Sequence, residues 1–166
     1  MSRSGQLQAV AKCGPRPGTI ARQLVGVWRL LNYTDEQEGH EDSLPFGLEP
    51  EGILIYTPDG FVSAQLMKAG RPVFQSRDWH GGTPDEYQQA GSGYIAYCGT
   101  YEVDEEKETV THVPSVALLP HLILKRQLRS ITLNGDRLTL CTLRIPTPNN
   151  GSVTSRLEWQ RAGAQC

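Results

Sequence analysis

The chain has 166 residues, of which 38% are hydrophobic, so it is long enough for one domain with a single core. Its formal net charge of −2 excludes the strong positive field of proteins that bind nucleic acids or anionic membranes, so we expect neither partner. No apolar run approaches the roughly 20 residues of a membrane-spanning helix, and the first residues lack the apolar stretch of a signal peptide, which predicts a cytoplasmic location.

The chain opens on a polar segment, MSRSGQLQAVAKCGPRPG, that is broken by Gly-Pro and Pro-Gly pairs. Such a composition favours disorder, because it offers little apolar surface to bury. We therefore predict a disordered N-terminal lead over residues 1–20 and one domain over residues 21–166, with a single helical turn at 19–24 where the two meet.

From residue 25 onward, short runs of alternating hydrophobicity follow one another, which is the pattern of half-buried β-strands. The predicted strands are 26–33, 52–57, 61–67, 94–103, 109–113, 122–133, 137–143 and 152–160. Turn signals such as TPDG at 57–60 and NGD at 134–136 indicate that most strands pair with their sequence neighbours. Closing such an antiparallel sheet removes its exposed edges, and about eight strands leave room for one small ligand. We predict an all-β, up-and-down barrel, with a β-sandwich as the alternative.

The segment between the third and fourth predicted strands, residues 68–93, is too long for a simple turn. Thr83 suits the N-cap of a helix, Pro84 suits the first helical position, and Glu86 completes a capping box. The pattern predicts a short helix at about 84–91 that belongs to a lid or plug of the barrel.

Gly26-Val27-Trp28 on the first strand of an antiparallel meander resembles the lipocalin pattern. In that fold the Trp packs across the closed end of the barrel under an Arg of the last strand, so the resemblance implies that Arg156 or Arg161 stacks on Trp28. The runs YTPDGFVSAQLM, AYCGTYEVD and LNGDRLTL resemble, more narrowly, the lipocalin-like domain proteins of bacteria and fungi, over residues 24–162. Some fungal members lie in secondary-metabolite pathways, so the resemblance implies a polyketide-like substrate.

Alternate side chains of a barrel strand face the interior, and the resemblance implies which set lines the cavity. Three polar residues of that set are candidate catalytic residues. His112 would act as general acid and base, Arg129 would hold a carboxylate, enolate or ketone oxygen, and Tyr97 would donate to a developing oxyanion. The candidates for substrate binding are Ser63, Gln65, Tyr101 and Gln127 on the strands and Trp79 on the insertion.

Each catalytic candidate also has a purely structural alternative. His112 can be a core residue bonded to a backbone group, Arg129 can form an internal ion pair with a glutamate, and Tyr97 can simply fill the barrel. On the insertion, Asp78 beside His80 is a secondary candidate for activating a nucleophile, and solvated surface residues are the alternative there.

Neither the cysteines nor the histidines have metal-ligand spacing, and the chain has no phosphate-loop or dinucleotide fingerprint, so we expect neither a metal nor a cofactor. The leading hypothesis is a cofactor-independent enzyme, of the polyketide cyclase or hydrolase type, that binds a reactive intermediate in the barrel and promotes its cyclisation or release. The alternative is a non-catalytic carrier of a hydrophobic metabolite. The identity of the substrate, the oligomeric state and a polyketide synthase as physical partner stay open.

Overall fold

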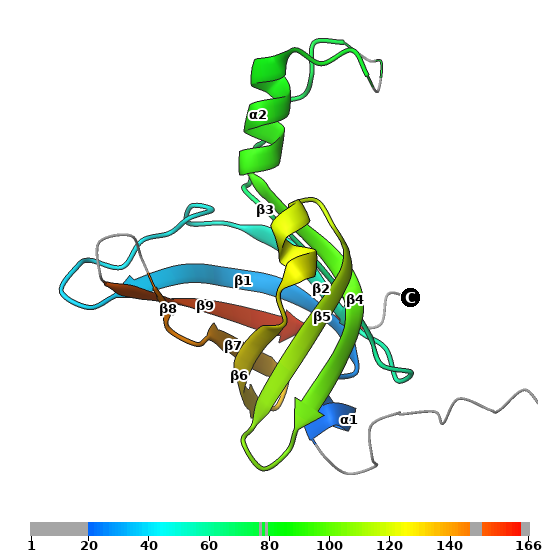
Figure 1. The fold of residues 1–166 in the computed structure, drawn as a ribbon, viewed down its shortest axis with the longest axis vertical. Helices are drawn as coiled ribbons and strands as arrows, with labels where there is room; N and C mark the ends of the chain where they lie inside the picture. Colours follow the sequence, from blue (N-terminus) through cyan, green and yellow to red (C-terminus); the bar gives the residue numbers. More distant parts are fainter. Residues whose placement is uncertain (1–19, 77, 79, 147–150, 164–166) are drawn as a thin grey trace, which may run out of the picture.

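The computed structural model describes residues 20–76, 78, 80–146 and 151–163 (Figure 1). All but the last residue of the predicted N-terminal lead therefore lies outside the described residues. The elements, in chain order, are α1 (Ile20–Leu24), β1 (Gly26–Gln37), β2 (Glu51–Tyr56), β3 (Phe61–Met67), α2 (Pro84–Ser92), β4 (Tyr94–Asp104), β5 (Thr109–Ala117), the 3-10 helix η1 (Pro120–Leu124), β6 (Gln127–Asn134), β7 (Arg137–Thr142), β8 (Ile145–Pro146) and β9 (Ser152–Arg161).

The strands form one closed antiparallel sheet, which confirms the predicted barrel over the sandwich. Strands β1 to β7 pair in sequence order, β7 pairs with β9, and β9 pairs with β1 to close the sheet. The short β8 pairs with the start of β9 at Ile145↔Val153, beyond the part of β9 that pairs with β7. Strands β7 and β8 thus share one position in the barrel, which has eight such positions in all.

Three predicted strand boundaries are wrong by four residues or more. The predicted strand 109–113 is β5, which runs on to Ala117 because β4 continues to pair with it as far as that residue. The first part of the predicted strand 122–133 is the 3-10 helix η1, because Pro120 cannot donate to a sheet ladder and opens a helical turn instead. Strand β6 begins only at Gln127. Strand β1 runs on to Gln37, because β9 continues to pair with it as far as Val153.

Trp28 is completely buried at the end of the barrel that α1 closes. Its Nε1 donates a 2.8 Å hydrogen bond to the carbonyl of Leu24 at the end of that helix. Arg161, and not Arg156, lies over the indole, with its guanidinium carbon 4.1 Å from the ring centroid. The same guanidinium donates to the carbonyls of Val25, at 3.0 Å, and Gln23. The closed end predicted from the Gly-x-Trp pattern is confirmed.

Gly26 explains why this pattern begins with a glycine. Its φ of +134° lies in a region that residues with a side chain rarely adopt. A Cβ at this position would also lie 2.9 Å from Nη1 of Arg161. Glycine therefore lets the backbone turn into β1 while the arginine reaches across it to the carbonyls beside Trp28.

The predicted helix in the insertion is confirmed with its capping box. The Thr83 side chain accepts from the backbone N–H of Glu86, and the Glu86 carboxylate accepts from the backbone N–H of Thr83. Figure 1 shows α2 standing beyond the ends of β3 and β4, away from the barrel. None of the helices in the described part of the chain has the length and apolar character that crossing a membrane requires.

Candidate ligand-binding cavity

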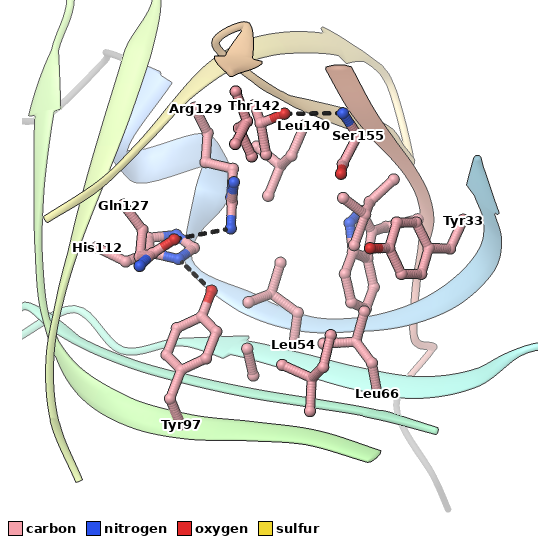
Figure 2. A pocket seen from close by; sticks show the side chains of 15 residues that line it. Tyr33, Leu54, Leu66, Tyr97, His112, Gln127, Arg129, Leu140, Thr142 and Ser155 are labelled. Carbon is pink, nitrogen blue, oxygen red and sulfur yellow. Dashed lines mark hydrogen bonds between the residues drawn. The ribbon is translucent and has the colours of Figure 1, made fainter. Parts of the chain in front are cut away.

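The barrel encloses a cavity of about 170 Å³ between its inward-facing side chains (Figure 2). A cavity of about 150 Å³ is known to hold benzene, so this one has room for a single aromatic ring with small substituents. Its apolar wall consists of Leu54, Ala64, Leu66, Ile95, Leu140, Ile145 and Leu157. Its polar lining consists of Tyr33, Tyr97, His112, Gln127, Arg129, Thr142, Ser155 and Trp159. Between them, β4, β5 and β6 place Tyr97, His112, Gln127 and Arg129 here, as the sequence predicted.

The predicted inward face of β3 is wrong. Val62, Ala64 and Leu66 are buried, whereas Ser63 and Gln65 lie on the opposite face of the strand, away from the cavity lining. Gln65 accepts a hydrogen bond from the hydroxyl of Tyr94 on that outer side. The physical reason is that the first set is entirely apolar, and the core selects the register that buries the apolar set.

Tyr101 is inward and buried, as predicted, but it does not line the cavity. Its hydroxyl donates a 3.0 Å hydrogen bond to the carbonyl of Thr57, at the start of the β2–β3 turn. Its ring packs edge-on against Tyr56, with the two centroids 4.9 Å apart. Tyr101 therefore fills the core beyond the cavity and has no surface that a ligand there would contact.

His112 is 1% exposed and lies between two tyrosine hydroxyls. Its Nε2 is 2.6 Å from the hydroxyl of Tyr56, and its Nδ1 is 2.8 Å from the hydroxyl of Tyr97. Burial, with a smaller contribution from the charge of Arg129, lowers the pKa of His112 to about 3. The imidazole is therefore neutral at ordinary pH, and its structural partners are side chains rather than the backbone group considered from the sequence.

Tyr56 was missed by the sequence analysis. It lies on the same face of β2 as Leu54, and both side chains are buried. The alternation of Leu54 and Tyr56 was the available signal for an inward hydroxyl. What the alternation cannot show is that β2 and β5, which are not adjacent strands in the sheet, bring Tyr56 and His112 into contact.

Arg129 carries a positive charge into the cavity without a carboxylate partner among the described residues. Its Nη2 donates a long, 3.4 Å hydrogen bond to Oε1 of Gln127, which Figure 2 shows beside it. The internal ion pair with a glutamate, considered as its structural alternative, does not form. Arg129 therefore has donors left for a group inside the cavity.

Trp159 is a second cavity residue that the sequence analysis missed. It is 2% exposed, and its Nε1 has no hydrogen-bond partner among the described residues. Ser155, on the same strand, is paired with other residues: its hydroxyl donates to Asp35 at 2.6 Å, and its backbone N–H donates to the Thr142 hydroxyl at 2.8 Å. A buried N–H without an acceptor is uncommon, since leaving it unpaired is costly.

The candidates on the insertion are not part of this cavity. Asp78 and His80 are exposed, and the backbone N–H of His80 donates to the Asp78 carboxylate at 3.1 Å. Trp79 lies outside the described residues. No described residue of segment 68–93 lines the cavity in this conformation. Within the described ranges, no cluster of three or more His, Cys, Asp or Glu side chains is placed to hold a metal ion.

Comparison with known proteins adds two matches. A family model described as a lipocalin-like domain matches residues 25–162, which include every strand of the barrel. A curated 4'-hydroxy-3'-methoxypropiophenone carrier protein of Aspergillus oryzae is 28% identical over 106 residues, covering 60% of this chain and 96% of the relative. No solved structure shows a significant match.

Proposed function

The chain belongs to the lipocalin-like domain family, and from this premise we propose that its barrel binds and carries a compact, largely apolar metabolite through a carbonyl-type oxygen. The observation that carries the proposal is the composition of the cavity. Apolar atoms make up most of the cavity surface, while Arg129 presents guanidinium N–H donors that, among the described residues, make one long hydrogen bond and have no carboxylate partner. A ligand oxygen that accepts from these donors satisfies groups that the folded protein leaves unpaired.

The size of the cavity and the curated relative support the same class of ligand. About 170 Å³ suits one substituted ring better than a long polyketide chain. The relative is named as a carrier of 4'-hydroxy-3'-methoxypropiophenone, which is an aromatic ring that bears a ketone. By analogy, we propose an aryl ketone or a similar polyketide-like phenolic compound as the ligand of this chain.

The state of His112 favours a carrier over an enzyme that uses this residue as acid and base. A general acid or base works best when its pKa lies near the working pH, whereas the pKa of His112 is about 3. Both ring nitrogens are also hydrogen-bonded within the protein, to Tyr56 and Tyr97. His112 thus serves to hold other groups in place, and a carrier needs no more than that.

A catalytic function of the same cavity is the second candidate, because Arg129 and Tyr97 both line it. Donors that point at an oxygen where negative charge develops stabilise an enolate, which is an intermediate in many cyclisations of polyketide-type compounds. In this second candidate the protein promotes cyclisation or release of a reactive intermediate without a cofactor. It would then act next to a polyketide synthase that supplies the intermediate.

One experiment separates the two candidates. Purified protein is titrated with 4'-hydroxy-3'-methoxypropiophenone and, separately, mixed with linear polyketide-type diketones while product formation is followed. The carrier predicts saturable binding of the aryl ketone with diketone conversion equal to that in buffer. Turnover above buffer that Arg129→Met lowers about a hundredfold or more, and that exposed Arg156→Met leaves intact, establishes the enzyme instead. Absence of saturable binding and of turnover contradicts both candidates.

A further inference from the structure

We propose that Tyr56, a residue outside the cavity lining, sets the direction of the hydrogen bonds through His112, so that Tyr97 is a donor to the ligand and the cavity prefers ligands with an acceptor oxygen. This inference rests on the proposed binding function and deepens it. It adds a positioning residue, Tyr56, that does not touch the ligand. It also explains the preferred class of ligand by the direction of the hydrogen bonds between three buried side chains.

The chain of groups is Tyr56, His112 and Tyr97, from strands β2, β5 and β4. Tyr56 is 1% exposed and contacts Nε2 of the imidazole at 2.6 Å, while Tyr97 lines the cavity and contacts Nδ1 at 2.8 Å. Figure 2 shows the Tyr97 hydroxyl directed at His112 on the rim of the open space, with Arg129 and Gln127 on the same side. One end of the chain is therefore sealed in the core, and the other end is at the ligand.

A neutral imidazole has one N–H donor and one acceptor nitrogen, so the chain can run in only two directions. In the first, Tyr56 donates to Nε2 and the Nδ1–H donates to Tyr97, whose own O–H is then available to the cavity. In the second, Tyr97 donates to Nδ1 and the Nε2–H donates to Tyr56. The two directions give the ligand opposite groups, because only the first leaves the Tyr97 proton for it.

The burial of Tyr56 decides between them. In the second direction the Tyr56 O–H would need another acceptor, and the structure shows His112 as the one hydrogen-bond partner of this hydroxyl among the described residues. A buried hydroxyl proton without an acceptor destabilises the folded state, because it loses the hydrogen bond that it makes with water in the unfolded chain. In the first direction the sealed end is satisfied, and the available proton lies where a ligand can accept it.

The two contact lengths agree with the first direction. Bonds donated by O–H groups are shorter than bonds donated by N–H groups, and the contact of Tyr56 is the shorter of the two, at 2.6 Å against 2.8 Å.

The consequence is a cavity whose adjustable donor matches its fixed one. The guanidinium of Arg129 can only donate. A tyrosine hydroxyl can either donate or accept, and the chain through His112 assigns Tyr97 to donate as well. A ketone, enolate or phenolate oxygen accepts from groups of this kind, whereas an aliphatic replacement of the carbonyl accepts from neither of them.

The first test reads the tautomer of His112 directly and needs no ligand. Nitrogen-15 NMR of the imidazole distinguishes a protonated nitrogen from an acceptor nitrogen. In the wild type we expect a neutral ring with the proton on Nδ1. A proton on Nε2, or a ring protonated on both nitrogens at neutral pH, overturns the inference whether or not the protein binds a ligand.

The second test compares two ligands: 4'-hydroxy-3'-methoxypropiophenone and its analogue with a CH₂ group in place of the ketone carbonyl. Tyr56→Phe removes the donor to Nε2, so Tyr97 begins to donate to His112 instead of to the ligand. We expect the preference for the ketone over the analogue to fall about two- to tenfold, the range for one hydrogen bond. Tyr101→Phe is the matched control, because its hydroxyl donates to Thr57 outside this chain, and it should keep the wild-type preference.

The outcomes distinguish this inference from the proposed function. Equal ketone preference in wild type and Tyr56→Phe overturns the inference and leaves the carrier function standing. An equal loss in Tyr56→Phe and Tyr101→Phe also overturns it, because the loss then reflects packing. If the wild type binds neither compound, the proposed function fails for this ligand class, and the His112 tautomer still decides whether the chain runs as inferred.

Discussion

The two tryptophans of the described barrel are almost equally buried, at 0% and 2% exposure, yet their surroundings differ. Trp28 donates to the Leu24 carbonyl and lies beneath Arg161, which is itself bonded to backbone carbonyls. Within the described part of the chain, the indole N–H of Trp159 has no partner, and the arginine of the cavity, Arg129, makes one long hydrogen bond. The same two residue types are fully paired at the closed end and underpaired in the cavity.

This difference separates stability from binding. Paired polar groups cost nothing in the folded state, so the closed end can be optimised for packing alone. N–H donors that lack acceptors in the folded protein are tolerated in an apolar cavity where a ligand supplies the acceptor, and such local costs are common at functional sites. Substitutions at the closed end should therefore change the free energy of unfolding, and substitutions in the cavity should change affinity.

The largest expected effect is that of Trp28→Ala. Removing this completely buried side chain should lower the free energy of unfolding by about 3–5 kcal/mol, through lost burial and a residual cavity. Chemical denaturation of the folded variant measures the loss. A variant that keeps its unfolding midpoint but no longer binds ligand would place Trp28 in the binding site and break the comparison.

Arg129→Met should show the reverse pattern. Loss of a hydrogen bond from a charged group costs about 1.5–3 kcal/mol of binding energy, so affinity for a ketone ligand should fall about tenfold to a hundredfold. The free energy of unfolding should stay constant or rise, because an interior cation without a carboxylate partner is removed. Calorimetric titration and denaturation of one preparation test both halves, and a large loss of stability contradicts the assignment.

Acid should weaken the cavity side of the barrel before the carboxylates titrate. The pKa of His112 is about 3 in the folded protein and about 6.5 when the chain is unfolded, so protons bind preferentially to the unfolded state. This contribution to stability is complete above about pH 7 and declines as the pH falls toward 3. It amounts to about 2 kcal/mol between pH 7 and pH 5.

Denaturation midpoints measured at several pH values test this dependence. His112→Gln should remove the decline between pH 7 and pH 5, whereas His80→Gln, at an exposed position, should retain it. An unchanged slope in His112→Gln would show that the imidazole is not held neutral by its burial.

The smallest expected effect is that of Arg161→Met. The methionine still covers the Trp28 ring, so the loss comes from the cation–π contact, the partly exposed hydrogen bonds to Gln23 and Val25, and a partly exposed ion pair with Asp136. We expect the free energy of unfolding to fall by about 1 kcal/mol, with ligand affinity unchanged. A drop in ligand affinity without a drop in the free energy of unfolding would contradict the assignment of Arg161 to stability and of Arg129 to ligand binding.

Local patterns in the sequence determined most of the fold. Alternating hydrophobicity defined the strands, TPDG and NGD indicated antiparallel neighbours, and Gly26 with Trp28 indicated the closed end, because each signal acts over a few residues. The capping box of Thr83 and Glu86 is equally local and is also confirmed. The predicted strand at 122–133 was wrong at its start, because Pro120 cannot donate to a sheet ladder and begins the 3-10 helix instead.

The residues that line the cavity were predictable in part from the sequence and were decided in part by the packed tertiary structure. Parity along single strands indicated which side chains share a face, and the resemblance to lipocalin-like proteins implied that the face of Tyr97, His112, Gln127 and Arg129 is the inward one, where the structure places them. The inward set that the resemblance implied was wrong for Ser63 and Gln65, because the alternate set of β3 is entirely apolar and is the one that the core buries.

The partners of the inward groups were decided by the tertiary structure alone. Tyr56 and His112 are far apart in sequence and lie on strands that are not neighbours, and they meet only because the closed sheet curves their side chains into one interior. The unpaired state of the Trp159 N–H is likewise a property of everything around it, which no local pattern records. Strand periodicity in the sequence determines which side chains share a face, whereas the hydrogen-bonded chain of Tyr56, His112 and Tyr97 exists only once the barrel has closed.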